Sequence, residues 1–207
     1  MLPRNKIAIV MYTGAMRYKP GHKEQSHARI LEAVGRGFRR HGIGGIGVDG
    51  LAREAGVTSG AFYTHFPSKS AAFEEAALAG LESLRASIEA LKAEHGSGWV
   101  AAFVDFYLGF KRTCLLDEAC GLQALTPEVI RADVAVRSAY QASLTGVVQA
   151  FAQGLPERHG ALSNQERAWA LLALLSGGVT MARSTADEKL SDEIAMAVKQ
   201  AARIVVG

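Results

Sequence analysis

The side chains that could do chemistry in this chain gather in residues 47–69, GVDGLAREAGVTSGAFYTHFPSK. They include no nucleophile beside a base, no paired carboxylates, no phosphate-binding glycine loop and no cluster of metal ligands. What they suit is hydrogen bonding to phosphates and base edges. We expect one short helix to expose Ser59, Gly60, Tyr63, Thr64 and His65. Such an edge of short polar and aromatic groups fits the major groove of DNA.

Two residues flank this short helix. Thr58 can cap its start by accepting a hydrogen bond from a free backbone N–H. Lys69 falls in the first turn of the next helix, where its charge opposes the helix dipole, and a bound phosphate would satisfy both the lysine and the free N–H groups. The alternatives are a solvated Lys69 and a His65 that caps the end of its own helix.

The elements that must position these groups are two short helices, 48–55 and 59–65, that cross steeply through a tight turn. Gly56 falls where the chain leaves the first helix and needs a left-handed backbone. Val57 would plug the turn from inside, and Ala52 is small enough for the two helices to approach. The core of the pair is expected to be formed by Leu51, Ala55 and Phe62, and further aromatic core residues by Phe38, Phe66 and Phe73.

Apolar residues recur at helical spacing through most of the remaining chain, which predicts an all-α fold with a small head and a larger bundle. An amphipathic first helix begins near Glu24 and ends in the glycine-dense run HGIGGIG. Ser68 can cap a long helix over 69–94. The later helices are expected at 99–116, 127–154, 164–184 and 191–206, with loops at 117–126 and 155–163.

Composition and charge fit a soluble, cytoplasmic DNA-binding protein. Hydrophobic residues make up 49% and charged residues 21% of the 207 residues, which is typical of a globular chain. Residues 1–69 carry 11 Lys and Arg against 4 Asp and Glu, so the basic part of the chain should meet phosphate. Cys114 and Cys120 are too few for a disulfide scaffold and are not spaced as zinc ligands. A redox role for them is the alternative to burial.

Three segments resemble the tetracycline-repressor (TetR) family of bacterial transcriptional regulators. They are ARILEAVGRGFRRHG, LAREAGVTSGAFYTHF and PSKSAAF. A fourth, CGLQALTPEVIRAD, looks like a segment common in one branch of the family. The resemblance is close over about residues 22–84.

The resemblance implies a homodimer that places two recognition helices in successive major grooves of a near-palindromic operator, and repression relieved by a ligand. It also implies base or phosphate contacts by Thr58, Ser59, Gly60, Tyr63, Thr64 and His65, and a phosphate contact by Lys69. Family members often begin the second helix with a threonine, whereas Gly47 and Val48 stand there in this chain. A backbone N–H could replace that contact.

Three regions follow from these patterns. Residues 22–84 are expected to form the DNA-binding domain and residues 85–207 the ligand-binding and dimerisation domain. Residues 1–21 fit neither, so we interpret them as an N-terminal arm. One hypothesis is that translation starts at Met16, and the other is a disordered arm that adds basic contacts to DNA.

The C-terminal domain offers a candidate ligand pocket and a candidate interface. An apolar pocket would be lined by Phe103, Phe106, Tyr107, Phe110, Tyr140, Trp169 and Met181. A dimer would form through the last two helices, where Leu171, Leu172, Leu174 and Leu175 precede a run of small residues, and where Ile194, Val198 and Val205 form a stripe. The alternative in both cases is packing within one chain. No cofactor and no metal are expected.

These observations predict a sequence-specific DNA-binding regulator, with repression released by an unknown small-molecule inducer. The sequence leaves activation open as well. The rival interpretations are a helical-bundle enzyme, for which no site is visible, and a nonspecific DNA-binding protein without a sensor.

Overall fold

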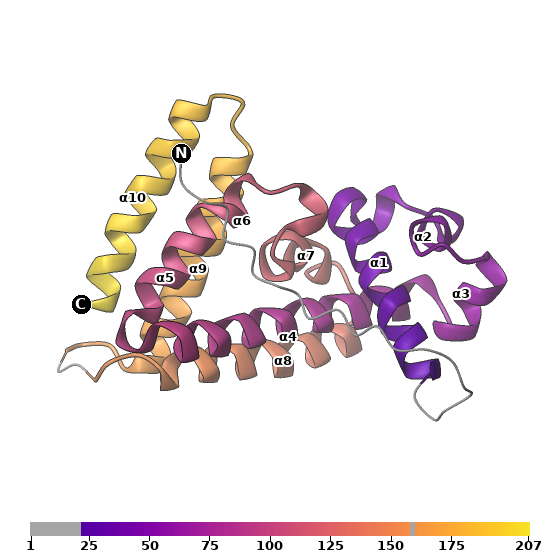
Figure 1. The fold of residues 1–207 in the computed structure, drawn as a ribbon, viewed down its shortest axis with the longest axis horizontal. Coiled ribbons are helices and arrows are strands. Elements are labelled where there is room, and N and C mark those ends of the chain that lie inside the picture. The colour runs from indigo at the N-terminus through magenta and orange to yellow at the C-terminus, as the bar shows by residue number, and fades with distance from the viewer. Residues whose placement is uncertain (1–21, 158–159) are drawn as a thin grey trace.

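The computed structural model describes residues 22–157 and 160–207, and within these ranges the chain is helical with no strand. A small head stands at one end of a long bundle (Figure 1). The head consists of α1 (His22–Gly45), α2 (Val48–Glu54) and α3 (Ser59–His65). From the head α4 (Lys69–His95) runs along the bundle, so one helix belongs to both parts. The predicted fold class is confirmed.

The bundle packs its long helices in pairs. In Figure 1 α8 follows α4 along its length, and α10 lies beside α9. A 3-10 turn, Gly96–Gly98, leads from α4 into the first bundle helix. The bundle helices are α5 (Trp99–Leu108), α6 (Phe110–Thr113), α7 (Gly121–Val129), α8 (Val134–Gln153), α9 (Asn164–Arg183) and α10 (Glu188–Val206).

The expected single helix over 99–116 is wrong, because the chain breaks at Gly109. This glycine has φ −89° and ψ −90°, outside the helical region. A Cβ at Gly109 would lie 2.7 Å from the Asp105 carbonyl oxygen, so the break requires a residue without a side chain. The short α6 then turns toward the end of α9.

The expected loop over 117–126 and the expected helix start at residue 127 are also wrong. Helix α7 occupies most of that loop, and Pro127 lies inside it near its C-terminal end. The helix has no side-chain cap at its start, and burial of Leu122, Leu125 and Val129 at helical spacing holds it in place. Asp133 then caps α8, with its carboxylate accepting from the Val136 N–H at 3.0 Å.

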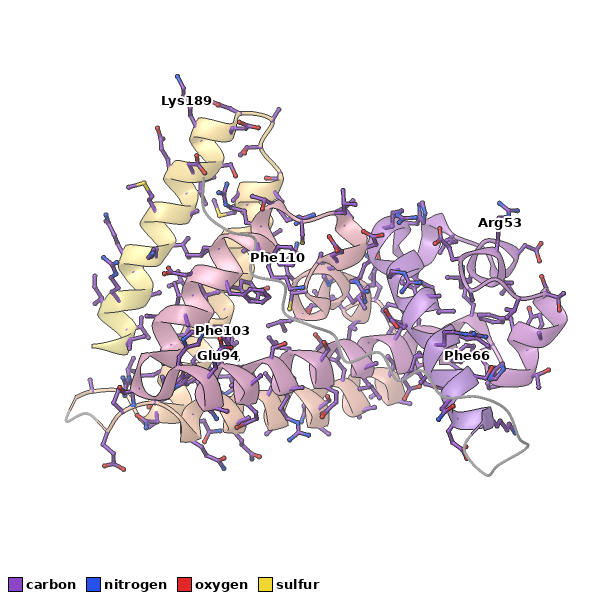
Figure 2. The ribbon with its side chains drawn as sticks, in the orientation of Figure 1. Arg53, Phe66, Glu94, Phe103, Phe110 and Lys189 are labelled. Carbon is purple, nitrogen blue, oxygen red and sulfur yellow. The ribbon has the colours of Figure 1, made fainter. Side chains whose placement is uncertain are left out.

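The predicted aromatic core of the head is confirmed. Phe38, Phe62, Phe66 and Phe73 are all buried, and the Phe38 and Phe73 rings meet edge to face at 5.5 Å. Phe66 lies inside the head between α1 and α4 (Figure 2). Because α4 supplies Phe73, the head core extends into the helix that enters the bundle.

A second connection joins the head to the bundle through the 3-10 turn η2 (Leu116–Glu118). Arg39 donates from Nε to the Asp117 carbonyl oxygen at 2.6 Å, and Arg40 donates from Nη2 to the Asp117 carboxylate at 2.5 Å. Arg40 holds the pKa of the Asp117 carboxyl below its ordinary value through that hydrogen bond and its charge. The head is therefore held to the bundle by α4 and by η2, which immediately precedes α7.

Two expectations fall outside the described residues: the N-terminal arm over 1–21 and the translation start at Met16. None of the helices in the described ranges combines the length and the apolarity that crossing a membrane requires.

Candidate nucleic-acid interface

The turn between α2 and α3 has the predicted geometry. Gly56 adopts φ +67°, the left-handed conformation that only glycine takes without strain. The Val57 N–H donates to the Ala52 carbonyl at 2.9 Å, and the Gly56 N–H donates to the Arg53 carbonyl at 3.1 Å. This pair of bonds is a Schellman motif, which satisfies the last carbonyls of α2 and fixes the direction in which α3 leaves.

The two short helices are held by one buried seam. Leu51 and Ala52 of α2 and Phe62 of α3 are buried, while Ala55 and Val57 are partly buried against them. Thr58 caps α3 as predicted, with its side-chain oxygen accepting from the Ala61 N–H at 3.1 Å. With one face fixed, α3 presents its opposite face outward.

The outward face of α3 brings together the residues singled out from the sequence. Thr58, Gly60, Tyr63 and Thr64 are exposed, whereas Ser59 and His65 are half-buried. Tyr63 keeps 55% of its surface exposed and meets Phe62 edge to face. A Cβ at Gly60 would have no protein atom closer than Thr58 Oγ1 at 3.9 Å, so the surface there is open.

Internal hydrogen bonds divide the hydroxyl groups of this face into donors and acceptors. Ser59 donates to the Asp49 carboxylate at 2.5 Å, and Thr64 donates to the Gly60 carbonyl at 3.2 Å, so both retain only acceptor capacity. Thr58 accepts within the protein and keeps its proton free. The Tyr63 hydroxyl has no partner within the described ranges. The face therefore offers donors at Thr58 and Tyr63 and acceptors at Ser59 and Thr64.

Lys69 is already engaged in the protein. Its ammonium donates to the Ile43 carbonyl at 2.8 Å, just after the break of α1 at Gly42, and to the Ile46 carbonyl at 3.2 Å, in the link from α1 to α2. An ammonium has three donors, so one remains for a phosphate. The sequence argument considered only the helix that Lys69 begins and missed this contact with the segment that joins α1 to α2.

His65 does not form the cap considered from the sequence: no hydrogen bond links it to the α3 carbonyls within the described ranges. Its ring lies 5.5 Å from the ring of His27 in α1, centroid to centroid. His27 in turn lies 2.7 Å from a Glu75 carboxylate oxygen in α4. The end of α3 therefore packs through a ring contact on His27, which is itself hydrogen-bonded to α4.

Asp49 and His27 are the participants that sequence reasoning missed. Each acts across elements, Asp49 from α2 to α3 and His27 from α1 to α4, so no periodicity within one helix reveals them. The only signal in the sequence was an acidic residue in the first turn of α2. A further charged residue, Arg53, projects from α2 away from the core (Figure 2).

The expected ligand pocket does not form as predicted, because its residues divide between the inside and the outside of the bundle. Helical spacing indicates a shared face only where the helix continues, and α5 ends before Phe110. Trp169 and Met181 lie on the outer side of α9. The residues that point inward are Phe103, Tyr107 and Tyr140, and those that are exposed or half-exposed are Phe106, Phe110, Trp169 and Met181.

Two hollows in the structure lie elsewhere. One of about 430 Å³ is in the head, between the end of α1 and α2, and includes His41 and Arg53. The other, of about 230 Å³, lies between α5 and α10, where Val100 and Val104 face Ala202. Neither is lined by any of the seven predicted pocket residues.

The interior of the bundle has a polar centre among its aromatic residues. Tyr140 and Thr126 join hydroxyl to hydroxyl at 2.7 Å. The Tyr107 hydroxyl is buried with no hydrogen-bond partner. Burial raises the pKa of the Tyr107 phenol well above its ordinary value and raises that of Tyr140 as well. Both phenols therefore stay protonated at neutral pH.

The described part of the chain contains two free cysteines and no cluster of metal-ligating side chains. No three of its His, Cys, Asp and Glu side chains gather in a metal-binding arrangement. Cys114 and Cys120 are both free thiols, and Cys120 is buried as expected whereas Cys114 is half-buried.

Comparison with known proteins agrees with this geometry. Residues 30–76 match the family model of the bacterial regulatory proteins of the tetR family. That match spans most of the head and the start of α4. The search of curated protein sequences gave no match.

Solved structures share the fold along nearly the whole chain. The reduced form of NemR from E. coli superimposes with a TM-score of 0.70 and 20% identity, covering 85% of this chain and 96% of its own. A TetR-family regulator from Streptomyces coelicolor gives 0.66 and 20%, with 89% and 97% covered. A TetR-family regulator from Agrobacterium tumefaciens gives 0.65 and 18%, with 86% and 97% covered.

Proposed function

The chain carries the tetR-family domain at residues 30–76 and has the fold of TetR-family transcriptional regulators, and from this premise we propose that it is a sequence-specific repressor released from its operator by a small molecule. The observation that carries the proposal is the outward face of α3. A rigid helix held by a buried seam there presents unpaired donors and acceptors to solvent, as a recognition helix must.

The hydrogen-bond roles of that face suggest what each residue reads. Ser59 and Thr64 can only accept, so we assign them to the amino groups of adenine or cytosine. Thr58 and Tyr63 can donate to phosphate oxygens or to guanine and thymine acceptors. Gly60 lets the backbone come close to the bases.

The two basic residues at the ends of this face are assigned to the phosphate backbone. His65 ends α3, and Lys69 begins α4 with one donor free. Contacts of this kind fix the register of a protein on DNA without reading its sequence. The free N–H groups at the start of α2, near Gly47 and Val48, are assigned the same role.

A homodimer through α9 and α10 would hold two such heads about 34 to 36 Å apart, one turn of B-DNA. Leu171, Leu172 and Leu175 are buried within the protomer and are not available to a partner, whereas the remaining expected interface residues are half-buried: Leu174, Ile194, Val198 and Val205. The outer face of the same helices does offer an interface. The large exposed apolar residues of α9 and α10 are Trp169, Met181, Leu190, Met196 and Ile204.

Gly177 lies on this outer face of α9 with no atom within 4 Å of its Cβ position, so a partner helix could approach closely there. Gly178 by contrast already packs on Val198 of α10. A two-fold axis beside Gly177 would bury the same patch on both subunits.

Release would follow from a ligand that binds the bundle more tightly in a state with a different head separation. Two connections can carry that change: α4, which passes from the head core into the bundle, and η2, which Arg39 and Arg40 hold against α1. We assign the protein to the cytoplasm, where its operator would be, and assign it no enzymatic reaction.

The experiment is selection of bound sequences from a randomised DNA pool, followed by titration of the winner and of random DNA at one fixed salt concentration, because affinity for DNA depends steeply on salt. A near-palindromic winner bound at least about 1000-fold more tightly than random DNA supports the proposal. Equal affinity for all sequences would indicate a nonspecific DNA-binding protein. If the protein binds no DNA at all, the helical-bundle enzyme becomes the interpretation to test.

A further inference from the structure

The Tyr107 hydroxyl in the middle of the bundle has no hydrogen-bond partner. The side chain is 1% exposed, and no donor or acceptor meets its Oη atom in hydrogen-bonding geometry. A buried hydroxyl without a partner is costly, so this position calls for a partner such as a buried water or a polar atom of a ligand. The neighbouring phenol of Tyr140 shows the contrast, since it donates to Thr126, whose own proton goes to the Leu122 carbonyl.

The surroundings of this hydroxyl are polar but uncharged. The Cys120 thiol and the Ser176 hydroxyl act on the pKa of the Tyr107 phenol as weak hydrogen-bonding neighbours, although neither meets its Oη atom in hydrogen-bonding geometry, and the Tyr140 phenol acts on it electrostatically. The Phe103 ring stands beside the Tyr107 ring, with centroids 5.5 Å apart, and Phe151 continues the aromatic wall.

Arg167 is the only charged side chain that is buried in the described part of the chain, and it is fully engaged elsewhere. Its guanidinium donates to the Pro156 carbonyl, to the Asn164 side chain and to carbonyls in the last turn of α10. A charged group placed beside Tyr107 would therefore be buried without a counter-charge, which is strongly unfavourable.

The segment that leads into α7 supplies the Cys120 neighbour of Tyr107 and packs closely on α4. Cys120 directly precedes α7, and the next residue, Gly121, meets Gly80 of α4 backbone to backbone. A Cβ on Gly121 would lie 2.7 Å from the Gly80 Cα atom, so the two backbones are in close contact and leave no room for a side chain at this point. Because Tyr107 is fully buried, a ligand beside it would require α7 to move away from α4, and η2, to which the head is hydrogen-bonded, would move with it.

We propose that the inducer is an uncharged molecule with an aromatic or apolar body and a single hydrogen-bond acceptor, and that Tyr107 donates its proton to that acceptor. This inference rests on the proposed function, since it names the ligand class of the regulator. The aromatic or apolar body of the ligand would pack on the Phe103 ring, and its acceptor would take the hydrogen bond that the Tyr107 hydroxyl lacks.

The test uses the full chain and three probes of nearly equal shape: acetophenone, α-methylstyrene, in which a methylene group replaces the carbonyl oxygen, and benzoate, which carries a charge. Dissociation constants are measured by ligand-observed NMR without DNA. The wild type should bind acetophenone about two- to tenfold more tightly than α-methylstyrene, the effect of one net hydrogen bond, and should bind benzoate most weakly.

The substitution Tyr107→Phe should abolish the preference for acetophenone, while binding of α-methylstyrene stays the same or improves. Tyr140→Phe is the matched control, because it removes a phenol that already has a partner, and the preference should survive it. A preference that survives Tyr107→Phe, equal binding of acetophenone and α-methylstyrene to the wild type, tighter binding of benzoate, or no binding of any probe would each overturn the inference.

Operator binding is measured separately, on the selected operator and without any probe. Its absence would refute the proposed function whatever the NMR titrations give. Intact operator binding without the acetophenone preference would refute only the assignment of the ligand class.

Discussion

Two isosteric substitutions in the same core should change stability with opposite signs. In Tyr107→Phe the oxygen that is lost has no partner, so its buried, unsatisfied state, which costs about 1 to 3 kcal/mol, disappears. Part of that gain is offset by the small void that the oxygen leaves, and we expect a net stabilisation of about 1 kcal/mol. In Tyr140→Phe a made hydrogen bond disappears, so we expect a loss of about 1 kcal/mol.

The two variants should therefore differ by about 2 kcal/mol, which corresponds to about 4 to 8 °C in melting temperature for a chain of this size. The measurement is urea-induced unfolding followed by circular dichroism, at one protein concentration for all variants because oligomerisation stabilises the folded state. Each variant differs from the wild type by one oxygen atom, so the denaturant slope should not change.

A Tyr107→Phe variant as unstable as Tyr140→Phe would refute this reasoning. It would mean that the Tyr107 hydroxyl has a partner in solution, such as a buried water, and the argument for a ligand acceptor would lose its premise. If Tyr107→Phe is both more stable than the wild type and without a preference for acetophenone, the hydroxyl that lowers the stability of the free protein is the group that binds the ligand acceptor.

Three further predictions concern the head, the interface and the connection between head and bundle. Tyr63→Ala should weaken operator binding about tenfold or more in a fixed-salt titration, because a dimer loses the same contact twice. Helix content and oligomeric state should stay unchanged, and full affinity would remove Tyr63 from the interface. Gly177→Glu should give a folded monomer by sedimentation that no longer holds the operator, whereas Gly146→Glu, at an equally open helical glycine on α8, should remain dimeric; a dimeric Gly177→Glu would move the interface elsewhere. Asp117→Asn should be less stable than the wild type at neutral pH, and the difference should vanish in acid. The reason is that Arg40 lowers the folded-state pKa of Asp117. The stabilisation is therefore present above the ordinary carboxyl pKa of about 4 and is lost as the pH falls through the lowered value. A difference that persists unchanged at pH 2 would contradict that cause.

The head could be predicted almost completely from the sequence because its signals are local. Gly56 needs a left-handed conformation, Thr58 and Ser68 cap the helices that they precede, and Phe62 recurs at core spacing within one helix. Each of these depends on residues within about four positions, where backbone geometry restricts the choices.

The bundle was predicted less well because its signals are not local. Gly109 breaks a stretch whose apolar spacing continues on both sides, and α7 begins without a cap and is held by burial against other helices. The candidate pocket failed for the same reason: Phe110 and Tyr107 share an apolar stripe in the sequence, but the helix changes direction between them.

The sequence alone determined that this chain is all-helical, that its basic N-terminal part contains two crossing helices, and which face of the second helix points outward. Those conclusions follow from steric rules, capping and periodicity, which act over a few residues. Only the tertiary structure decided that Lys69 binds the segment between α1 and α2, that Ser59 donates its proton to Asp49, and that Tyr107 is buried with an unpaired hydroxyl while Phe110 is exposed. Hydrogen bonds and burial between distant segments depend on how whole helices pack, and packing directions are not encoded in the spacing of any one helix.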